Sequence, residues 1–120
     1  LILDTVEDRN LKNLYNLKII NPCNYYDFLS LQKNAKIIFT DSGGIQEEAC
    51  ILKTPCITIR KNTERPETLK IKSNLLAGYS LKKINNLLNK MLVSKIKWKN
   101  PYGNNVSKKI LDILKKNYNR

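Results

Sequence analysis

Short apolar runs alternate along this chain with longer runs in which apolar residues recur at helical spacing. Residues 36–40 have an apolar centre, which is typical of a strand covered on both faces of a sheet. At about 100° per residue, Ile45, Ala49 and Leu52 fall on one stripe, which predicts a helix that packs on the sheet through this face. Residues 55–59 predict a second buried strand. The pattern indicates a strand–helix–strand unit.

The same alternation continues on both sides of this unit. In the helix predicted at 80–93, the residues spaced for burial are Leu81, Ile84, Leu88, Met91 and Leu92. The last predicted helix is amphipathic, and it follows an irregular stretch. The pattern predicts one α/β domain with a doubly wound parallel sheet. The further strands are predicted at 1–3, 17–20 and 73–77, and the other helices at 5–15, 25–32 and 105–118.

The turn between the first buried strand and its helix contains residues suited to binding an anion. Asp41 and Ser42 are good N-cap residues, and Gly43 and Gly44 allow the main chain to approach a ligand closely. The free N–H groups at the head of such a helix, together with its dipole, make a site for phosphate. Many strand-to-helix turns contain glycine, so this turn alone does not identify a function.

Two glutamates on this helix have different expected positions. Glu47 points away from the apolar stripe, into solvent, whereas Glu48 lies on its flank. A carboxylate there faces the crevice where open α/β sheets bind ligands. It suits a cis-diol such as a ribose, because each hydrogen bond to a charged acceptor contributes about 1.5–3 kcal/mol. The alternative is an ordinary exposed helical glutamate.

The polar stretch at 60–67 is predicted to be a loop that carries a phosphate clamp. Pro66 stiffens this loop, and Arg65 on a stiff loop beside a phosphate site can hold the anion. The alternative is that Arg65 forms a surface ion pair with Glu64 or Glu67, which would be worth little.

Composition narrows the possible functions. The net charge is +12, but the lysines are spread along the chain and no nucleic-acid-binding motif is present, so nucleic acid is not expected as a partner. Histidine is absent, which excludes His-dependent nucleophile pairs and His-based zinc sites. No apolar run approaches the roughly 20 residues of a membrane span, so no membrane contact is expected.

The cysteines indicate the redox environment of the chain, and the first residue concerns its N-terminus. Cys23, Cys50 and Cys56 are odd in number and lack metal-ligand spacing, so we expect free thiols in a reducing cytoplasm and no metal. The first residue is Leu1 rather than Met, so the N-terminus is expected to be a cut rather than a start.

The strings at the centre of the chain are more specific than any single residue in them. DSGGIQEEA (41–49), PCITIR (55–60) and TERPE (63–67) follow one another at close spacing. In this order they resemble the non-hydrolysing UDP-N-acetylglucosamine 2-epimerases. The likeness continues in YYDF (25–28), NLLAG (74–78) and NPYG (100–103), and it covers the C-terminal part of that enzyme.

The resemblance implies that this chain belongs to the second of two Rossmann-like domains in a glycosyltransferase-B arrangement. Residues 1–95 would form a UDP-binding domain that is incomplete at its N-terminus. Residues 96–120 would form a crossover segment and a helix that packs back on the first domain. The N-terminal catalytic domain would be absent from this chain.

The resemblance also assigns roles in binding UDP. It places Phe28 by the uracil and Cys23 in contact with the base, although a cysteine departs from the residue expected there. It implies that Glu48 binds the ribose hydroxyls and that Arg65 lines the same site. The positions that match the diphosphate-binding residues are Ser42, Gly43 and Gly44.

In such enzymes UDP is eliminated from UDP-N-acetylglucosamine and added back, which gives UDP-N-acetylmannosamine. The catalytic carboxylates lie in the first domain, so none of the catalytic residues is expected in this chain, and neither metal nor other cofactor is required. The full-length enzyme is expected to be a cytoplasmic homodimer. Two other possibilities are a glycosyltransferase of the same fold and a stand-alone nucleotide-binding module, and the exact UDP-sugar is not determined.

Overall fold

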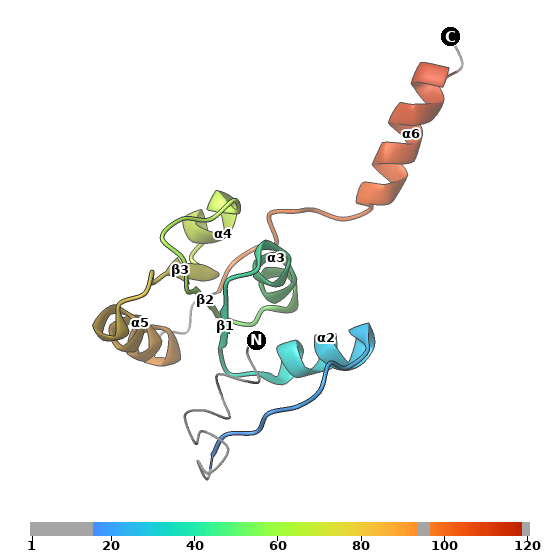
Figure 1. Ribbon diagram of the computed structural model, residues 1–120. Helices are drawn as coiled ribbons and strands as arrows, with labels where there is room; N and C mark the ends of the chain where they lie inside the picture. The colour runs from blue at the N-terminus through green and yellow to red at the C-terminus, as the bar shows by residue number, and fades with distance from the viewer. Residues whose placement is uncertain (1–15, 94–96, 119–120) are drawn as a thin grey trace.

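The structure, a computed structural model, describes residues 16–93 and 97–118 of the chain. Within these residues the centre is a three-stranded parallel sheet in the order β1-β2-β3 (Figure 1). The strand at 1–3 and the helix at 5–15 that the sequence predicts lie outside the described residues. The strands are β1 (Ile38–Thr40), β2 (Cys56–Thr58) and β3 (Asn74–Leu76).

Helices alternate with these strands, as the apolar pattern predicts. An unpredicted short helix, α4, begins at Pro66, inside the stretch expected to be a loop. Proline is favoured at the first position of a helix, because its fixed φ suits the helix and its missing N–H is not needed there. The helices of the described residues are α2 (Tyr25–Asn34), α3 (Gly43–Leu52), α4 (Pro66–Lys70), α5 (Leu81–Val93) and α6 (Val106–Tyr118).

The central strand β2 joins two layers of helices, because alternate residues of a strand point to opposite faces. Ile57 is fully buried and packs with Met91 of α5. Its neighbour Thr58 donates a hydrogen bond to Asn74, and Asn74 in turn donates to Gln46 of α3. Helices α5 and α3 therefore cover opposite faces of the sheet (Figure 1), as expected of a doubly wound arrangement.

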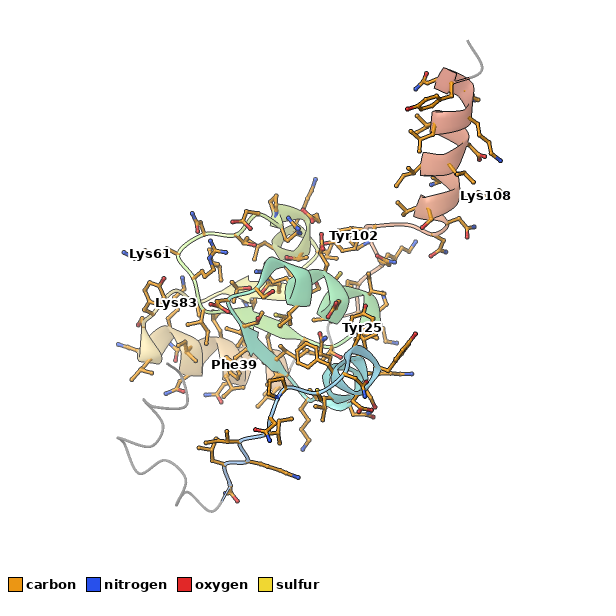
Figure 2. All side chains as sticks on the ribbon, turned by 45° about the vertical axis from the view of Figure 1, so that its right-hand side comes forward. Tyr25, Phe39, Lys61, Lys83, Tyr102 and Lys108 are labelled. Atoms are coloured by element: carbon orange, nitrogen blue, oxygen red, sulfur yellow. The ribbon has the colours of Figure 1, made fainter. Side chains whose placement is uncertain are left out.

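Two predictions about strands are wrong. Residues 17–20 form no strand, and Leu17 and Ile20 are 44% and 52% exposed. The run at 36–40 is not covered on both faces, because Phe39 on β1 is 41% exposed (Figure 2). Helix α5 packs over β2, which leaves the same face of β1 partly open at Phe39.

The buried faces of two helices also differ from the predicted ones. In α3 the buried residues include Gln46 and Cys50, while Ile45 and Leu52 are only half-buried, because α3 packs on α2 and α4 as well as on the sheet. In α5 the packed residues are Ile84, Leu87, Leu88 and Met91, as expected except for Leu87. Leu81 and Leu92 were expected to be buried and are mostly exposed; Leu81 lies at the very start of α5.

The segment after α5 crosses back over α3 and α4 before α6 begins. The Trp98 indole donates to the carbonyl of Cys50 (2.9 Å), and Lys53 donates to the carbonyl of Trp98 (2.7 Å). The Tyr102 hydroxyl donates to Glu67 of α4 (2.8 Å), at the point where the chain leaves the α/β body (Figure 2).

Helix α6 stands apart from the sheet (Figure 1). Its predicted amphipathic pattern is present, but its apolar side chains are about half exposed. The predicted boundary near residue 95 falls within 94–96, outside the described residues, so the division into two parts stays a prediction. The exposed aliphatic side chains of this helix are Val106, Ile110, Leu111, Ile113 and Leu114.

Asn74 is the centre of a buried polar network that holds the layers together. Its side chain is fully buried, accepts a hydrogen bond from Thr58 (2.8 Å) and donates to Gln46 (3.0 Å) and Thr68 (3.2 Å). Gln46 also accepts from the hydroxyl of Thr63 (2.5 Å). One buried amide thus connects β2, β3, α3 and α4.

We expect Asn74→Ala to lower the free energy of unfolding by about 2 kcal/mol or more, because each buried group left without a partner costs about 1–3 kcal/mol. Urea unfolding followed by circular dichroism measures the change. Asn89→Ala, on the exposed side of α5, is the matched control and should stay within about 0.5 kcal/mol. Equal effects of the two substitutions would contradict the role given to Asn74.

Candidate functional site

The glycine turn lies between β1 and α3, at the carboxyl end of the first strand. Ser42 occupies the N-cap position as predicted, but its side chain makes no capping hydrogen bond. Its own N–H donates to the Thr40 hydroxyl (3.0 Å). Gly43 and Gly44 are the first two residues of the helix, where N–H groups have no partner within the helix. The turn therefore presents main-chain donors and the positive end of a helix dipole.

The 60–67 stretch closes over this turn. A Cβ atom at Gly43 would lie 3.6 Å from Glu64 Oε2 and 3.9 Å from the Arg65 guanidinium carbon. Arg60 donates to the carbonyl of Asp41 (3.4 Å), which ties the same stretch to the start of the turn. The guanidinium of Arg65 and the first N–H groups of α3 are thus brought together, as the sequence predicts.

Arg65 is held by a partner that the sequence analysis did not identify. Its Nε forms an ion pair with Glu47 Oε1 at 2.5 Å, with the two side chains 32% and 35% exposed. The prediction that Glu47 points into solvent is therefore wrong, and neither Glu64 nor Glu67 is the ion-pair partner. The loop folds back onto α3, so it brings Arg65 over the turn of helix that carries Glu47.

The backbone of Arg65 is fixed on both sides. Its N–H donates to the Thr63 hydroxyl (3.0 Å), and its carbonyl accepts from the Thr68 hydroxyl (2.7 Å). Thr63 donates to the buried Gln46 of α3. The position of the arginine therefore rests on the buried network as well as on the proline that follows it.

Glu48 lies one turn along α3 from the glycine turn and contacts α2. Its Oε2 accepts a hydrogen bond of 2.6 Å from Gln32, which is only 4% exposed. Phe28 lies one turn before Gln32 on the same helix and is 37% exposed. Gln32 was not among the predicted site residues, although it lies one turn after Phe28 in a mostly apolar stretch, which is a signal visible in the sequence.

Cys23 is an exposed free thiol just before α2, which begins after the Asn24 N-cap. The site residues from the turn and the loop form one cluster. Phe28 joins it through Gln32 and Glu48, whereas Cys23 is placed near Phe28 only by its position along the chain. In the two described stretches, no three His, Cys, Asp or Glu side chains are placed to hold a metal ion.

Tyr102 is a second residue that sequence reasoning missed. Burial, and then its hydrogen bond to Glu67, raise the pKa of its hydroxyl well above the ordinary value. The hydrogen bond ties the crossing segment to the helix that follows Arg65.

The fold is that of a Rossmann-like α/β domain, and its glycine turn lies at the carboxyl end of a strand, where such domains bind ligands. A sequence profile of the UDP-N-acetylglucosamine 2-epimerases matches residues 2–115, and the chain belongs to this family. A UDP-N-acetylglucosamine 2-epimerase of Methanococcus maripaludis is 55% identical over 101 residues, which cover 84% of this chain and 28% of that protein.

Solved structures agree with the sequence relationship. The Methanocaldococcus jannaschii UDP-GlcNAc 2-epimerase in complex with UDP-GlcNAc and UDP is 48% identical, with a TM-score of 0.85 over 94% of this chain and 33% of that one. The Staphylococcus aureus MnaA–UDP structure is 27% identical, with a TM-score of 0.86 over 98% of this chain and 33% of that one.

The predicted family and the predicted α/β fold of the glycosyltransferase-B type are thereby confirmed. The chain spans about a third of the length of the relatives it matches. None of the helices in residues 16–93 and 97–118 is long and apolar enough to cross a bilayer.

The three thiols are expected to differ in reactivity, because the thiolate is the reactive form. Burial raises the pKa of Cys56 to about 12, although a hydrogen bond with Thr58 acts in the opposite direction. Cys50 is also buried, while Cys23 is exposed. Iodoacetamide at about pH 8, close to the ordinary thiol pKa, should therefore modify the folded chain at Cys23 alone, as mass spectrometry would show.

Cys23→Ser is the control and should leave the folded chain unmodified, while unfolding in guanidinium should expose the remaining thiols. Rapid alkylation of Cys56 in the folded chain would contradict the burial of this thiol.

Proposed function

We propose that this chain binds the UDP moiety of a UDP-sugar and is the nucleotide-holding part of an enzyme that interconverts UDP-N-acetylglucosamine and UDP-N-acetylmannosamine. One observation carries the proposal: the N–H groups of the glycine turn and the Arg65 guanidinium converge, with the Glu48 carboxylate one helical turn away. Family membership supports it, as do the relatives solved with UDP or UDP-GlcNAc.

In this proposal the diphosphate lies against the turn formed by Ser42, Gly43 and Gly44. The main-chain donors and the helix dipole bind the anion, and Arg65 adds a planar, permanently charged group. Because the glycines carry no side chain, phosphate oxygens can approach the backbone closely. The Ser42 hydroxyl, which does not cap the helix, is free to donate as well.

The nucleoside follows α3 and α2 away from the turn. Glu48 accepts hydrogen bonds from the ribose hydroxyls, and the ring of Phe28 lies by the uracil. Cys23 contacts the base through its main chain, which would tolerate an unusual side chain at this position.

The N–H groups of the glycine turn and Arg65 would also assist the reaction at the sugar. Elimination of UDP places negative charge on the leaving diphosphate, and preorganised N–H groups and an arginine stabilise that charge. The acid and base that act at the sugar are carboxylates in a part of the enzyme outside this chain. We further propose that the complete enzyme is a homodimer and works in the reducing cytoplasm, which suits its free cysteines.

We expect the chain to bind UDP in preference to ADP and Glu48→Ala to bind UDP about tenfold or more weakly. The reason is that a hydrogen bond to a charged acceptor contributes about 1.5–3 kcal/mol. Titration followed by NMR chemical shifts or calorimetry measures both. Asp112→Ala, which removes an exposed carboxylate from α6, is the control and should bind as the unchanged chain does. Preferential binding of ADP would sink the proposal.

Arg65→Ala should weaken UDP binding by about tenfold or more, since charge-assisted contacts to phosphate are about twice as strong as neutral ones. Affinity for uridine should change little, because uridine has no phosphate. Lys61→Ala removes a like charge from an exposed side chain of the same loop (Figure 2) and separates a specific clamp from the general effect of charge. Equal losses in the two variants would argue against a clamp at Arg65.

A further inference from the structure

Gln32 is buried between α2 and α3, and its side chain reaches Glu48. It is 4% exposed, and its Nε2 donates a hydrogen bond of 2.6 Å to Glu48 Oε2. Its backbone carbonyl accepts from the buried hydroxyl of Thr54 (2.9 Å), which fixes this turn of α2 against the end of α3. The amide is thus held in place and directed at one oxygen of the carboxylate.

One atom of the Gln32 amide is buried at a cost in stability. Among the described residues its Oε1 is buried and accepts no hydrogen bond. A buried polar atom without a partner lowers stability, and an apolar side chain of the same shape at such a site is often neutral or stabilising. Packing of α2 on α3 alone would therefore favour methionine over glutamine at this position.

We propose that Gln32 is a positioning residue for the ribose-binding carboxylate, an inference that rests on the proposed binding of UDP. Its N–H group holds Glu48 Oε2, so that Oε1 is presented to the ribose hydroxyls. A free glutamate side chain has several rotamers, and fixing it before the ligand arrives removes that entropic cost from binding. Phe28 lies one turn away on the same helix, so α2 sets the positions of the base contact and the ribose contact together.

The competing explanation is that Gln32 only fastens α2 to α3. This explanation predicts that loss of the amide lowers stability and weakens every uridine nucleotide equally. The proposal predicts the opposite on both counts: stability is kept, and only ligands with ribose hydroxyls lose affinity. The two explanations are therefore separable by one substitution and two ligands.

The test compares Gln32→Met with the unchanged chain, using UDP and 2′,3′-dideoxy-UDP in calorimetric titrations. We expect UDP to bind about three- to tenfold more weakly to the variant, in the range of measured couplings between contacting residues. Binding of the dideoxy nucleotide and the thermal midpoint should not fall. Lys33→Met, at the next and exposed position of α2, is the matched control and should change neither affinity.

A second variant gives a readout that a structural role would not produce. Gln32→Glu places two carboxyl groups within hydrogen-bond distance, and such a pair shares one proton. With that proton present, the new carboxyl donates to Glu48 as the amide did. The ratio of this variant's affinity for UDP to that of the unchanged chain should therefore fall as pH rises between about pH 5 and 8, where the raised pKa of such a pair lies. The terminal phosphate of UDP also titrates at about pH 6, but it affects both chains alike.

The possible results separate the role of Gln32 from the proposed binding of UDP. If the unchanged chain does not bind UDP, or binds the dideoxy nucleotide equally well, the proposed ribose contact fails and the inference fails with it. If the unchanged chain prefers UDP and Gln32→Met binds it equally well, only the role of Gln32 is overturned. A lowered thermal midpoint with equal losses for both nucleotides would also overturn it, in favour of a structural tie.

Discussion

The structure depends on a buried set of hydrogen bonds between amides and hydroxyls on the α3 side of the sheet. Asn74 and Gln46 connect β3 to α3, and the hydroxyls of Thr58, Thr63 and Thr68 extend the set to β2, the loop and α4. Such groups are costly when unpaired and directional when paired, so they permit one arrangement of these elements.

This constraint explains how a polar loop can hold an arginine over a glycine turn. The Arg65–Glu47 ion pair is about a third exposed, and ion pairs of that kind contribute little stability. Its effect is therefore on position: the Glu47 carboxylate lies against Nε, Nη1 donates to the Glu64 carbonyl, and Nη2 remains close to Gly43. Neutralisation by Glu47 also keeps the unliganded site from concentrating positive charge. The hydrogen bonds that Thr63 and Thr68 make with the backbone of Arg65, and that of Thr63 with Gln46, hold the arginine in place.

The sequence allowed much of the fold to be predicted, because the strand–helix alternation and the turn at Gly43 are local signals. It was also sufficient to identify Glu48 as a residue on the flank of α3. The buried amides of Gln46 and Asn74 could not be found in this way, since helical-wheel reasoning treats polar residues as exposed. Their partners are far apart in sequence, and only the folded chain brings them together. The pairing of Glu47 escaped prediction for the same reason.

The backbone between the α/β body and α6 determines the direction of this helix. Tyr102 is held by Glu67, and α6 starts at Val106. Between them Gly103 and Asn105 have φ angles of +70° and +60°, in the left-handed region. The direction in which α6 leaves the α/β body therefore depends on the backbone conformations of these two residues. Glycine adopts such a conformation readily, and asparagine does so more easily than most other residues.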